Sequence, residues 1–571
     1  MADIIVDRLK QMAEWPSQAE SFNAWLEMGS ALDLLRDNAQ QHEFVVYASD
    51  RFTFIHAILA PASLLNPPDI EDLMSWNCNP TTSWGVTVQF SEPRSVWISP
   101  PLEHTGSKTL DQGEQLVFSR DFDGRSGKKS YYEILQKFTH LFGLHYIDER
   151  HAYCRLDELG DVEDIIRIVE IPGKGEEFGL NVITFNRDLL DEYLVLTDSV
   201  IVRTFDFTRY RPGSFNGWRA AHDVQFQNDV DMHYRSHVEP GYASYLRGFQ
   251  LVRSLATKGQ IISRYDYTGA KKDRQYASFI AHDWKNNVIR EISCAPVATS
   301  NYFTKSNLPF ELSPAFFRPE VLMKYKADSE KYRLAGRSIS CRGTWSLQTY
   351  DINEAGQVHT YLVYLRNLPY EEQLYWKSYN EEPKAPISKR AFTTDFEGSW
   401  HLEYDALNSL LQAIGDLNRD QVPWWTLRSE KLKDQLHYPV TASADEWASE
   451  MLNLDQLVVE GFETKWLRTT AQSLGRTPDV RFASLRLMEE CLSALGFQED
   501  GAKKIVAPLR EVHDLRSKVK GHASGNEGAA LKKQILKEYG SFKEHFRNLC
   551  QRCDESIRAL MEVFKGDVGH S

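Results

Sequence analysis

The chain has 571 residues, of which 42% are hydrophobic and 26% charged, and its formal net charge is −14 at pH 7. This composition excludes collagen-like, disordered and membrane-spanning proteins, and the length is enough for two to four domains. The negative charge argues against a protein coated for nucleic-acid binding along its whole length. Positive charge is concentrated near the end, because residues 501–571 contain 14 Lys or Arg against 9 Asp or Glu.

The first 40 residues are expected to be helical, because apolar residues recur every three or four positions in residues 7–15 and 22–39. The opening residues lack the apolar stretch of a signal peptide. Seven thinly spread cysteines suit a reducing compartment. No apolar run approaches the roughly 18 residues that a membrane span needs. We therefore expect a cytoplasmic protein that has no membrane partner.

The middle of the chain, residues 41–398, is predicted to be an α+β region made mostly of sheet. Short segments rich in β-branched and aromatic residues alternate here with Gly, Pro, Asn and Asp. Helices are expected to intervene at residues 130–144 and 242–259. The region is expected to divide into two lobes near residues 205–215. Its aromatic-rich polar segments suit ligand or protein recognition.

A domain boundary is predicted within residues 380–400, which contain two prolines and mixed charge. Beyond it the hydrophobic period becomes 3.6 residues, and several of the periodic segments end at glycine. The sequence therefore predicts two domains, a sheet-rich region over residues 1–398 and an all-helical bundle over residues 399–571. The fold class is α+β.

An Arg–His pair near the end of the chain is the strongest candidate for chemistry. The spacing Arg-x4–6-His occurs three times, and only Arg516 and His522 lie in the basic part of the helical domain. In a straight helix these two side chains would point about 120° apart. They can converge only if the helix ends between them, and Gly521 is a residue type that commonly ends helices.

The segment "LRSKVKGHASG" within a late helical domain resembles the HEPN superfamily, over roughly residues 440–565. Members are helical bundles, and many cleave RNA as dimers without a metal ion. Arg516, Ser517 and His522 match the family's Arg, polar and His positions, although the family often has Asn, Asp or His where Ser517 stands. The resemblance implies an endoribonuclease that needs no cofactor and acts as a homodimer or higher homo-oligomer.

The residues present suit such a reaction. His522 can act as general base or acid, because the ordinary pKa of histidine lies near neutrality. Arg516 offers a permanently charged planar group for phosphate oxygens. Lys518 and Lys520 could bind flanking phosphates. A neighbour on the same helix could orient Arg516, and the two candidates are Glu511 and His513.

Two other interpretations stay open. The helical bundle could be a non-catalytic dimerisation or RNA-binding module, with the N-terminal region as a protein- or ligand-binding platform. Alternatively, an enzyme site could lie in the N-terminal region. His222, His233 and His237 are weak metal-ligand candidates there, and His233 and His237 are expected to share a helix face. Ordinary surface histidines are the alternative explanation for these three.

The layout resembles bacterial HEPN abortive-infection proteins, in which a long N-terminal region restrains a C-terminal nuclease until phage infection. This resemblance implies antiviral defence or growth arrest by RNA cleavage. It also implies a phage- or host-derived trigger that the N-terminal region binds.

Overall fold

A computed structural model describes the chain over the ranges 2–13, 29–50, 52–64, 73, 84–99, 110, 113–124, 127–172, 179–210, 222–229, 231–239, 243–265, 274–399, 404–520 and 526–567. It confirms the coarse prediction of an α+β protein with a sheet-rich N-terminal region and a helical C-terminal region. Within the described ranges, every helix is too short or too polar to cross a lipid bilayer.

The chain forms two compact units that differ from the predicted domains. Unit 1 comprises residues 1–157 and 162–272, and unit 2 comprises residues 158–161 and 273–571. The principal division therefore follows residue 272, whereas the sequence places its boundaries at 205–215 and 398. Strand β12 (Ser199–Tyr210) covers the described part of the first boundary, residues 205–210, and pairs there with β2 (Thr53–Pro61) on one side and β15 (Ala243–Val252) on the other. Continuous backbone pairing holds that stretch within one sheet.

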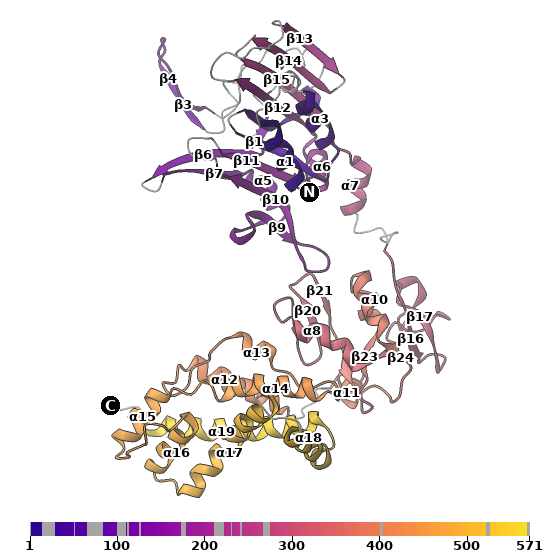
Figure 1. The fold of residues 1–571 in the computed structure, drawn as a ribbon. Coiled ribbons are helices and arrows are strands. Elements are labelled where there is room, and N and C mark those ends of the chain that lie inside the picture. Colours follow the sequence, from indigo (N-terminus) through magenta and orange to yellow (C-terminus); the bar gives the residue numbers. More distant parts are fainter. Residues whose placement is uncertain are drawn as a thin grey trace. The chain divides into compact units, whose positions relative to one another are not determined.

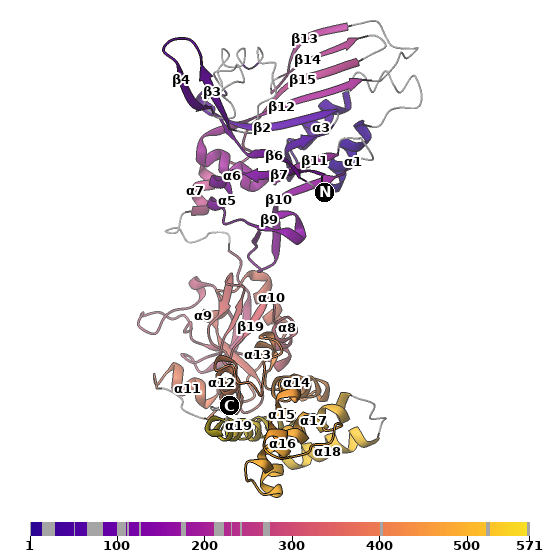
Figure 2. The ribbon, with the colours of Figure 1, turned by 90° about the vertical axis from the view of Figure 1, so that its left-hand side faces the viewer.

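Unit 1 is built on an eleven-stranded sheet, in the order β13-β14-β15-β12-β2-β1-β11-β10-β9-β8, with β5 paired to β2. Figure 2 shows β13, β14, β15, β12 and β2 side by side in this order. The other strands are β1 Glu43–Ser49, β2 Thr53–Pro61, β5 Glu114–Gln115, β8 His145–Ile147, β9 Ala152–Leu156, β10 Val162–Ile171, β11 Leu180–Asn186, β13 His222–Asp229, β14 Met232–Glu239 and β15 Ala243–Val252.

Helices cover both faces of this sheet, because successive residues of a strand point to opposite faces. On one face, α1 and α3 pack with Val45 and Ile55. On the other, α5 and α6 pack with Phe44, Val46 and Phe185. The helices of unit 1 are α1 Ala2–Ala13, α3 Gly29–Asn38, η1 Ala62–Leu64, α5 Gln136–Leu141, η3 Asp148–Arg150, α6 Arg187–Thr197 and α7 Lys258–Tyr265.

The helix expected at residues 130–144 is confirmed only in part, as α5 (Gln136–Leu141), and the stretch expected to be helical at 242–259 is mostly strand. Residues 130–134 belong to β7 (Gly127–Ile134), which pairs with β6 (Val117–Gly124), and helix α5 starts only afterwards. Most of the second stretch is β15, which pairs with β12 over ten consecutive residues. Cross-strand pairing and packing outweigh the local apolar spacing here, as they commonly do for β-forming sequences.

A second hairpin of unit 1 consists of β3 (Gly85–Gln89) and β4 (Ser95–Ser99). Among the described residues these two strands form a sheet of their own. Figure 2 shows the hairpin as a separate arm beside the main sheet of unit 1.

Unit 2 begins with a smaller antiparallel sheet in the order β17-β16-β18-β23-β22, with β24 paired to β18, and a three-stranded sheet β19-β20-β21. The buried side chains of this part surround Phe317 and Trp376. Its elements are β16 Ser278–Asp283, β17 Val288–Ser293, η4 Pro296–Ala298, β18 Pro314–Phe317, η5 Pro319–Leu322, α8 Met323–Ala327, β19 Tyr332–Leu334, β20 Ile339–Cys341, β21 Trp345–Leu347, β22 Asp351–Ile352, β23 Val358–Tyr361, α9 Leu362–Leu365, α10 Tyr370–Ser378, β24 Asn380–Glu381 and α11 Lys389–Asp395.

The rest of unit 2 is a bundle of helices, as the sequence predicts (Figure 1). Its apolar stripes meet in one core that includes Trp447, Leu509 and Leu549. Gly496, with φ of 98°, follows α16 in the left-handed conformation that glycine adopts most readily. The helices are α12 Ala406–Arg419, α13 Lys431–Gln435, α14 Ala444–Val458, α15 Thr464–Ser473, α16 Ser484–Ala494, α17 Glu499–Lys520, α18 Asn526–Tyr539 and α19 Phe542–Asp567.

Candidate functional site

Arg516 lies near the C-terminal end of α17, the helix that carries most of the predicted site. The helix buries Val506, Leu509 and Val512 in the bundle core, and this apolar stripe sets its rotation about its own axis. The described part of the helix runs to Lys520, and Gly521, where the sequence predicts its end, lies outside the described residues. His522 itself lies outside the described residues.

Two carboxylates hold the Arg516 guanidinium. Its Nη1 donates to Oδ2 of Asp455 at 2.6 Å and to Oε1 of Glu460 at 2.8 Å. The Asp455 side chain is 0% exposed, whereas about a third of the Arg516 side chain remains accessible. Burial alone would lower the pKa of Arg516, but the hydrogen bonds and charges of Asp455 and Glu460 outweigh burial and raise it.

Asp455 also engages His513. The His513 Nδ1 lies 3.1 Å from Oδ1 of Asp455, so each carboxylate oxygen of Asp455 has its own partner on α17. His513 and Arg516 are three positions apart on one helix and therefore lie on neighbouring positions of its surface. The Ser517 hydroxyl donates to the backbone carbonyl of His513 at 3.1 Å, a bond within the helix. His513 and Arg516 thus share Asp455 as a partner, and the expectation that His513 orients Arg516 stays a prediction.

Glu511 faces a different partner. Its two carboxylate oxygens accept from Nη1 and Nη2 of Arg552 on α19, at 2.8 and 3.0 Å. The expectation that Glu511 could orient Arg516 is therefore wrong, because the bidentate pair ties its carboxylate to another helix. The carboxylates that do hold Arg516 come from α14 and from Glu460, just after that helix.

Sequence reasoning missed Asp455, although the sequence carries a signal for it. Asp455 follows Met451 by four residues and precedes Val458 by three, so it stands within the buried stripe of α14. A charged residue in an otherwise apolar stripe calls for a buried partner of opposite charge. The identity of that partner, 61 positions away, is decided by the packing of α14 against α17.

Lys518 lines a shallow pocket of about 580 Å³ between α16 and α17. Three other basic side chains, Arg486, Lys503 and Arg510, line the same pocket. Glu489 accepts from Arg486 at 2.7 Å and from Arg510 at 2.5 Å, so part of this positive charge is neutralised. The backbone of Lys520 is helical, and its side chain lies outside the described part of the chain.

The weak metal candidates lie on strands. His233 and His237 belong to β14, so the expectation that they share a helix face is wrong. Cross-strand pairing sets His233 against Phe249 and His237 against Tyr245, with ring centroids 4.9 and 5.5 Å apart. The side chain of His222, on β13, lies outside the described residues. The described side chains form no cluster of three or more His, Cys, Asp or Glu suited to a metal ion.

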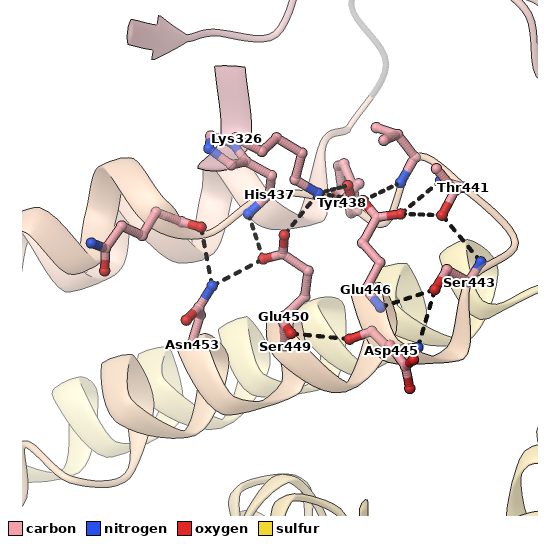
Figure 3. A network of polar contacts seen from close by, with 12 residues as sticks. Lys326, His437, Tyr438, Thr441, Ser443, Asp445, Glu446, Ser449, Glu450 and Asn453 are labelled. Atoms are coloured by element: carbon pink, nitrogen blue, oxygen red, sulfur yellow. Dashed lines mark hydrogen bonds and ion pairs between the residues drawn. The ribbon is translucent and has the colours of Figure 1, made fainter. Parts of the chain in front are cut away.

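A second polar cluster attaches α14 to the sheet-bearing part of unit 2. The Nζ of Lys326, on α8, donates to Glu446 at 2.5 Å and lies 2.8 Å from a carboxylate oxygen of Glu450. Figure 3 shows all three side chains pointing toward one another above α14. Burial raises the pKa of Glu450, while Lys326 and neighbouring donors outweigh burial at Glu446 and lower its pKa. The buried ammonium group of Lys326 therefore pairs with two buried carboxylates, those of Glu446 and Glu450.

The same cluster fixes the chain that leads into α14. Glu446 accepts from the backbone amide of Thr441 at 2.8 Å and from its hydroxyl at 2.6 Å, and Glu450 accepts from the amide of His437 at 3.0 Å. Burial lowers the pKa of His437 to about 4, and the charge of Lys326 lowers it further. Helix α14 thus pairs with Lys326 through Glu446 near its N-terminus and with Arg516 through Asp455 near its C-terminus.

Comparison of the chain with known protein families, with curated proteins and with solved structures found no match.

Proposed function

We propose that the helical part of unit 2 is a HEPN-like, metal-independent RNA endonuclease, with Arg516 and His522 as its catalytic residues. The observation that carries the proposal is the fixed position of Arg516. A fully buried carboxylate, Asp455, anchors this guanidinium close to the end of α17, and part of the side chain stays accessible. Anchoring of this kind pre-orients a cation for a phosphate, and so reduces the cost of ordering it when RNA binds.

The chemistry follows from the residue types. The 2′-hydroxyl of RNA attacks the adjacent phosphorus while His522 accepts its proton, and the bond from phosphorus to the 5′ oxygen breaks. The 5′ oxygen takes up a proton, and the other fragment ends in a 2′,3′-cyclic phosphate. Arg516 stabilises the negative charge that gathers on the phosphate oxygens. Lys518 and Lys520 contribute sequence-independent attraction for flanking phosphates.

The proposal includes the biological setting that the sequence resemblance implies. Unit 1 and the sheet of unit 2 would sense a phage- or host-derived trigger, and the nuclease would act as a homodimer or higher homo-oligomer in antiviral defence. Since an isologous dimer places identical surfaces together, two Arg516/His522 pairs could share one site.

RNA cleavage by the purified full chain in EDTA tests the proposal. Wild type, His522→Ala and Arg516→Ala would be given a mixed pool of tRNA and mRNA, and product ends would be analysed for 2′,3′-cyclic phosphate. We expect cleavage by the wild type and a loss of at least about 100-fold in each variant, which is the usual range for removing a general base or a charge-stabilising donor.

Matched controls are His140→Ala, on the exposed surface of α5, and Arg419→Ala, whose side chain is 70% exposed at the end of α12. Both should cleave like the wild type. Equal cleavage by all the proteins would place the chemistry elsewhere and contradict the proposal. If the wild type is inert, the assay is repeated with extract from infected cells, and inertness there too counts against a nuclease.

A second candidate function is a non-catalytic dimerisation or RNA-binding module. The observation that favours it is the pairing of Arg516 with two carboxylates, which already neutralise its charge. In that case His522→Ala keeps RNA binding and oligomer state unchanged. Arg516→Ala would lower the stability of unit 2 without altering any reaction.

A further inference from the structure

The β3–β4 hairpin of unit 1 carries an apolar face. The register pairs Val86 with Ile98 and Val88 with Val96. Because side chains alternate between the two faces of a strand, these four lie on the same face. Trp84 before β3 and Phe90 after it continue the same alternation. Large fractions of these side chains are accessible: Trp84 63%, Val86 72%, Val88 44%, Phe90 80%, Val96 66% and Ile98 69%.

The opposite face of the hairpin differs in character. Thr87, Gln89 and Ser95 point to that side, together with Trp97. Gln89 and Ser95 are joined by a hydrogen bond of 3.2 Å between their side chains. One face of the hairpin is therefore wholly apolar, whereas the opposite face is mixed, with mostly polar side chains and Trp97.

A two-stranded hairpin with such a face is poorly stable in water until the face is covered. Burying six aliphatic and aromatic side chains removes roughly 100 Å² of surface each, or about 600 Å² per copy. Two identical faces packed together would bury about 1,200 Å², which reaches the lower range of specific, stable interfaces. The area therefore matches what a stable dimer needs.

The chemistry of the face favours a second copy of this chain as its occupant. All six side chains are uncharged hydrocarbons or aromatics, so the face is complementary to itself and offers no charge for an oppositely charged partner to recognise. The loop at the hairpin tip carries an ion pair, Arg94 with Glu92 at 3.4 Å. Charges at the tip oppose insertion of the hairpin into a lipid bilayer.

We infer that the β3–β4 hairpin is a self-association surface, in which the apolar faces of two copies stack into a four-stranded, two-layer sandwich. Stacked sheets lie about 10 Å apart and interdigitate their inward side chains. The surface lies in unit 1 and exists whether or not the helical part of unit 2 cleaves RNA. It gives the chain a dimer contact that the Arg516 site does not supply.

The first test compares Val96→Glu with Ser95→Glu in the full chain by sedimentation velocity across a range of concentrations. The two substitutions are adjacent on β4 and add the same charge, but to opposite faces. We expect the wild type and Ser95→Glu to dimerise with similar affinity. Val96→Glu should weaken dimerisation by at least about tenfold, since it would bury an unpaired charge. Circular dichroism would check that both variants keep the fold.

A cross-linking test separates this surface from any dimer made through unit 2. The test uses a Cys78→Ser background, because the six other cysteines of the chain are buried. Val88→Cys, on the apolar face, should then be joined to a second copy by a bis-maleimide that spans about 10 Å, the distance between stacked sheets. Ser95→Cys, on the opposite face, should be joined much less.

Three results would overturn the inference. The first is a wild type that stays monomeric up to about 100 μM, which corresponds to a dimerisation free energy weaker than about −5.5 kcal/mol. The second is equal dimerisation of Val96→Glu and Ser95→Glu. The third is equal cross-linking from both faces. Wild-type binding to vesicles of phosphatidylcholine and phosphatidylglycerol that Val96→Glu loses would instead identify a membrane as the occupant. Loss of RNA cleavage alone would bear on the proposed nuclease and leave this surface unaffected.

Discussion

At the scale of single residues, Asp455 organises the candidate site. A buried carboxylate must find a cation or donors, because leaving its charge unpaired in the core would cost several kcal/mol. Asp455 finds two partners on α17, His513 at 3.1 Å and Arg516 at 2.6 Å. Because Asp455 acts through Arg516, it is a positioning residue in the proposed reaction.

The substitution Asp455→Asn tests that role. It keeps the size of the side chain and removes its charge, so Arg516 would keep only Glu460 as a charged partner. We expect unit 2 to lose about 1.5–3 kcal/mol of stability, the range for hydrogen bonds to charged groups, and RNA cleavage to fall at least about tenfold. Urea unfolding and initial cleavage rates measure the two effects. Asp420→Asn, in the exposed turn after α12, is the control. Unchanged cleavage would remove Asp455 from the site.

A second residue-scale prediction concerns His56, on β2 in the core of unit 1. The residue is fully buried, and burial lowers the pKa of its imidazole to about 4, against a small opposing effect from the Val117 backbone. The unfolded chain binds this proton near pH 6.5 and the folded chain only near pH 4. Stability from neutral His56 is therefore complete above pH 6.5 and is lost as the pH falls toward 4, by roughly 3 kcal/mol.

The measurement is the free energy of unfolding of unit 1 at several pH values between 7 and 4. In His56→Phe, the decline with falling pH should be shallower than in the wild type by about that amount. His140→Phe, at an exposed position of α5, should follow the wild-type curve. Parallel curves for His56→Phe and the wild type would show that His56 is not neutral in the folded chain.

At the scale of elements, α14 connects two parts of unit 2. Its Glu446 and Glu450 pair with Lys326 of α8 (Figure 3). Its Asp455 pairs with Arg516 of α17. A Ser443 cap and acidic residues in its first turn stabilise the start of the helix close to this cluster. Ion pairs therefore attach α14 both to Lys326 of α8 and to Arg516 of the candidate site.

The substitution Lys326→Met tests the connection. It leaves Glu446 and Glu450 buried without their cation, and we expect a loss of about 3–5 kcal/mol in the stability of unit 2. The triple variant Lys326→Met/Glu446→Gln/Glu450→Gln removes the charges together and should recover much of that loss. Lys431→Met, which removes a 65% exposed lysine paired with Glu330, should cost less than about 1 kcal/mol. If Lys326→Met costs no more than Lys431→Met, the cluster does not hold α14.

At the scale of the whole molecule, the chain consists of two units with separate cores. Each of the five clusters of buried apolar side chains draws on one unit alone, three on unit 1 and two on unit 2. Cooperative unfolding follows from a shared core, so a chain with separate cores need not unfold in one step.

We therefore expect two unfolding transitions in urea for the full chain. Hydrogen exchange measured by mass spectrometry assigns each transition to its peptides. Lys326→Met should lower only the midpoint of unit 2, and His56→Phe should change the pH dependence of unit 1 alone. A single transition, shifted as a whole by either variant, would show that the two units fold as one.

The periodicity of the sequence was sufficient to determine the helical C-terminal region, the strand-rich region before it and the shared helix of His513 and Arg516. These features depend on neighbours in sequence, and apolar spacing reports them directly. The tertiary structure decided the rest. β15 became a strand because β12 lies beside it, the units divide after residue 272, and the charge of Asp455 meets Arg516 only when α14 packs on α17. Such pairings join positions far apart in sequence, and their energy depends on burial that only the assembled core creates.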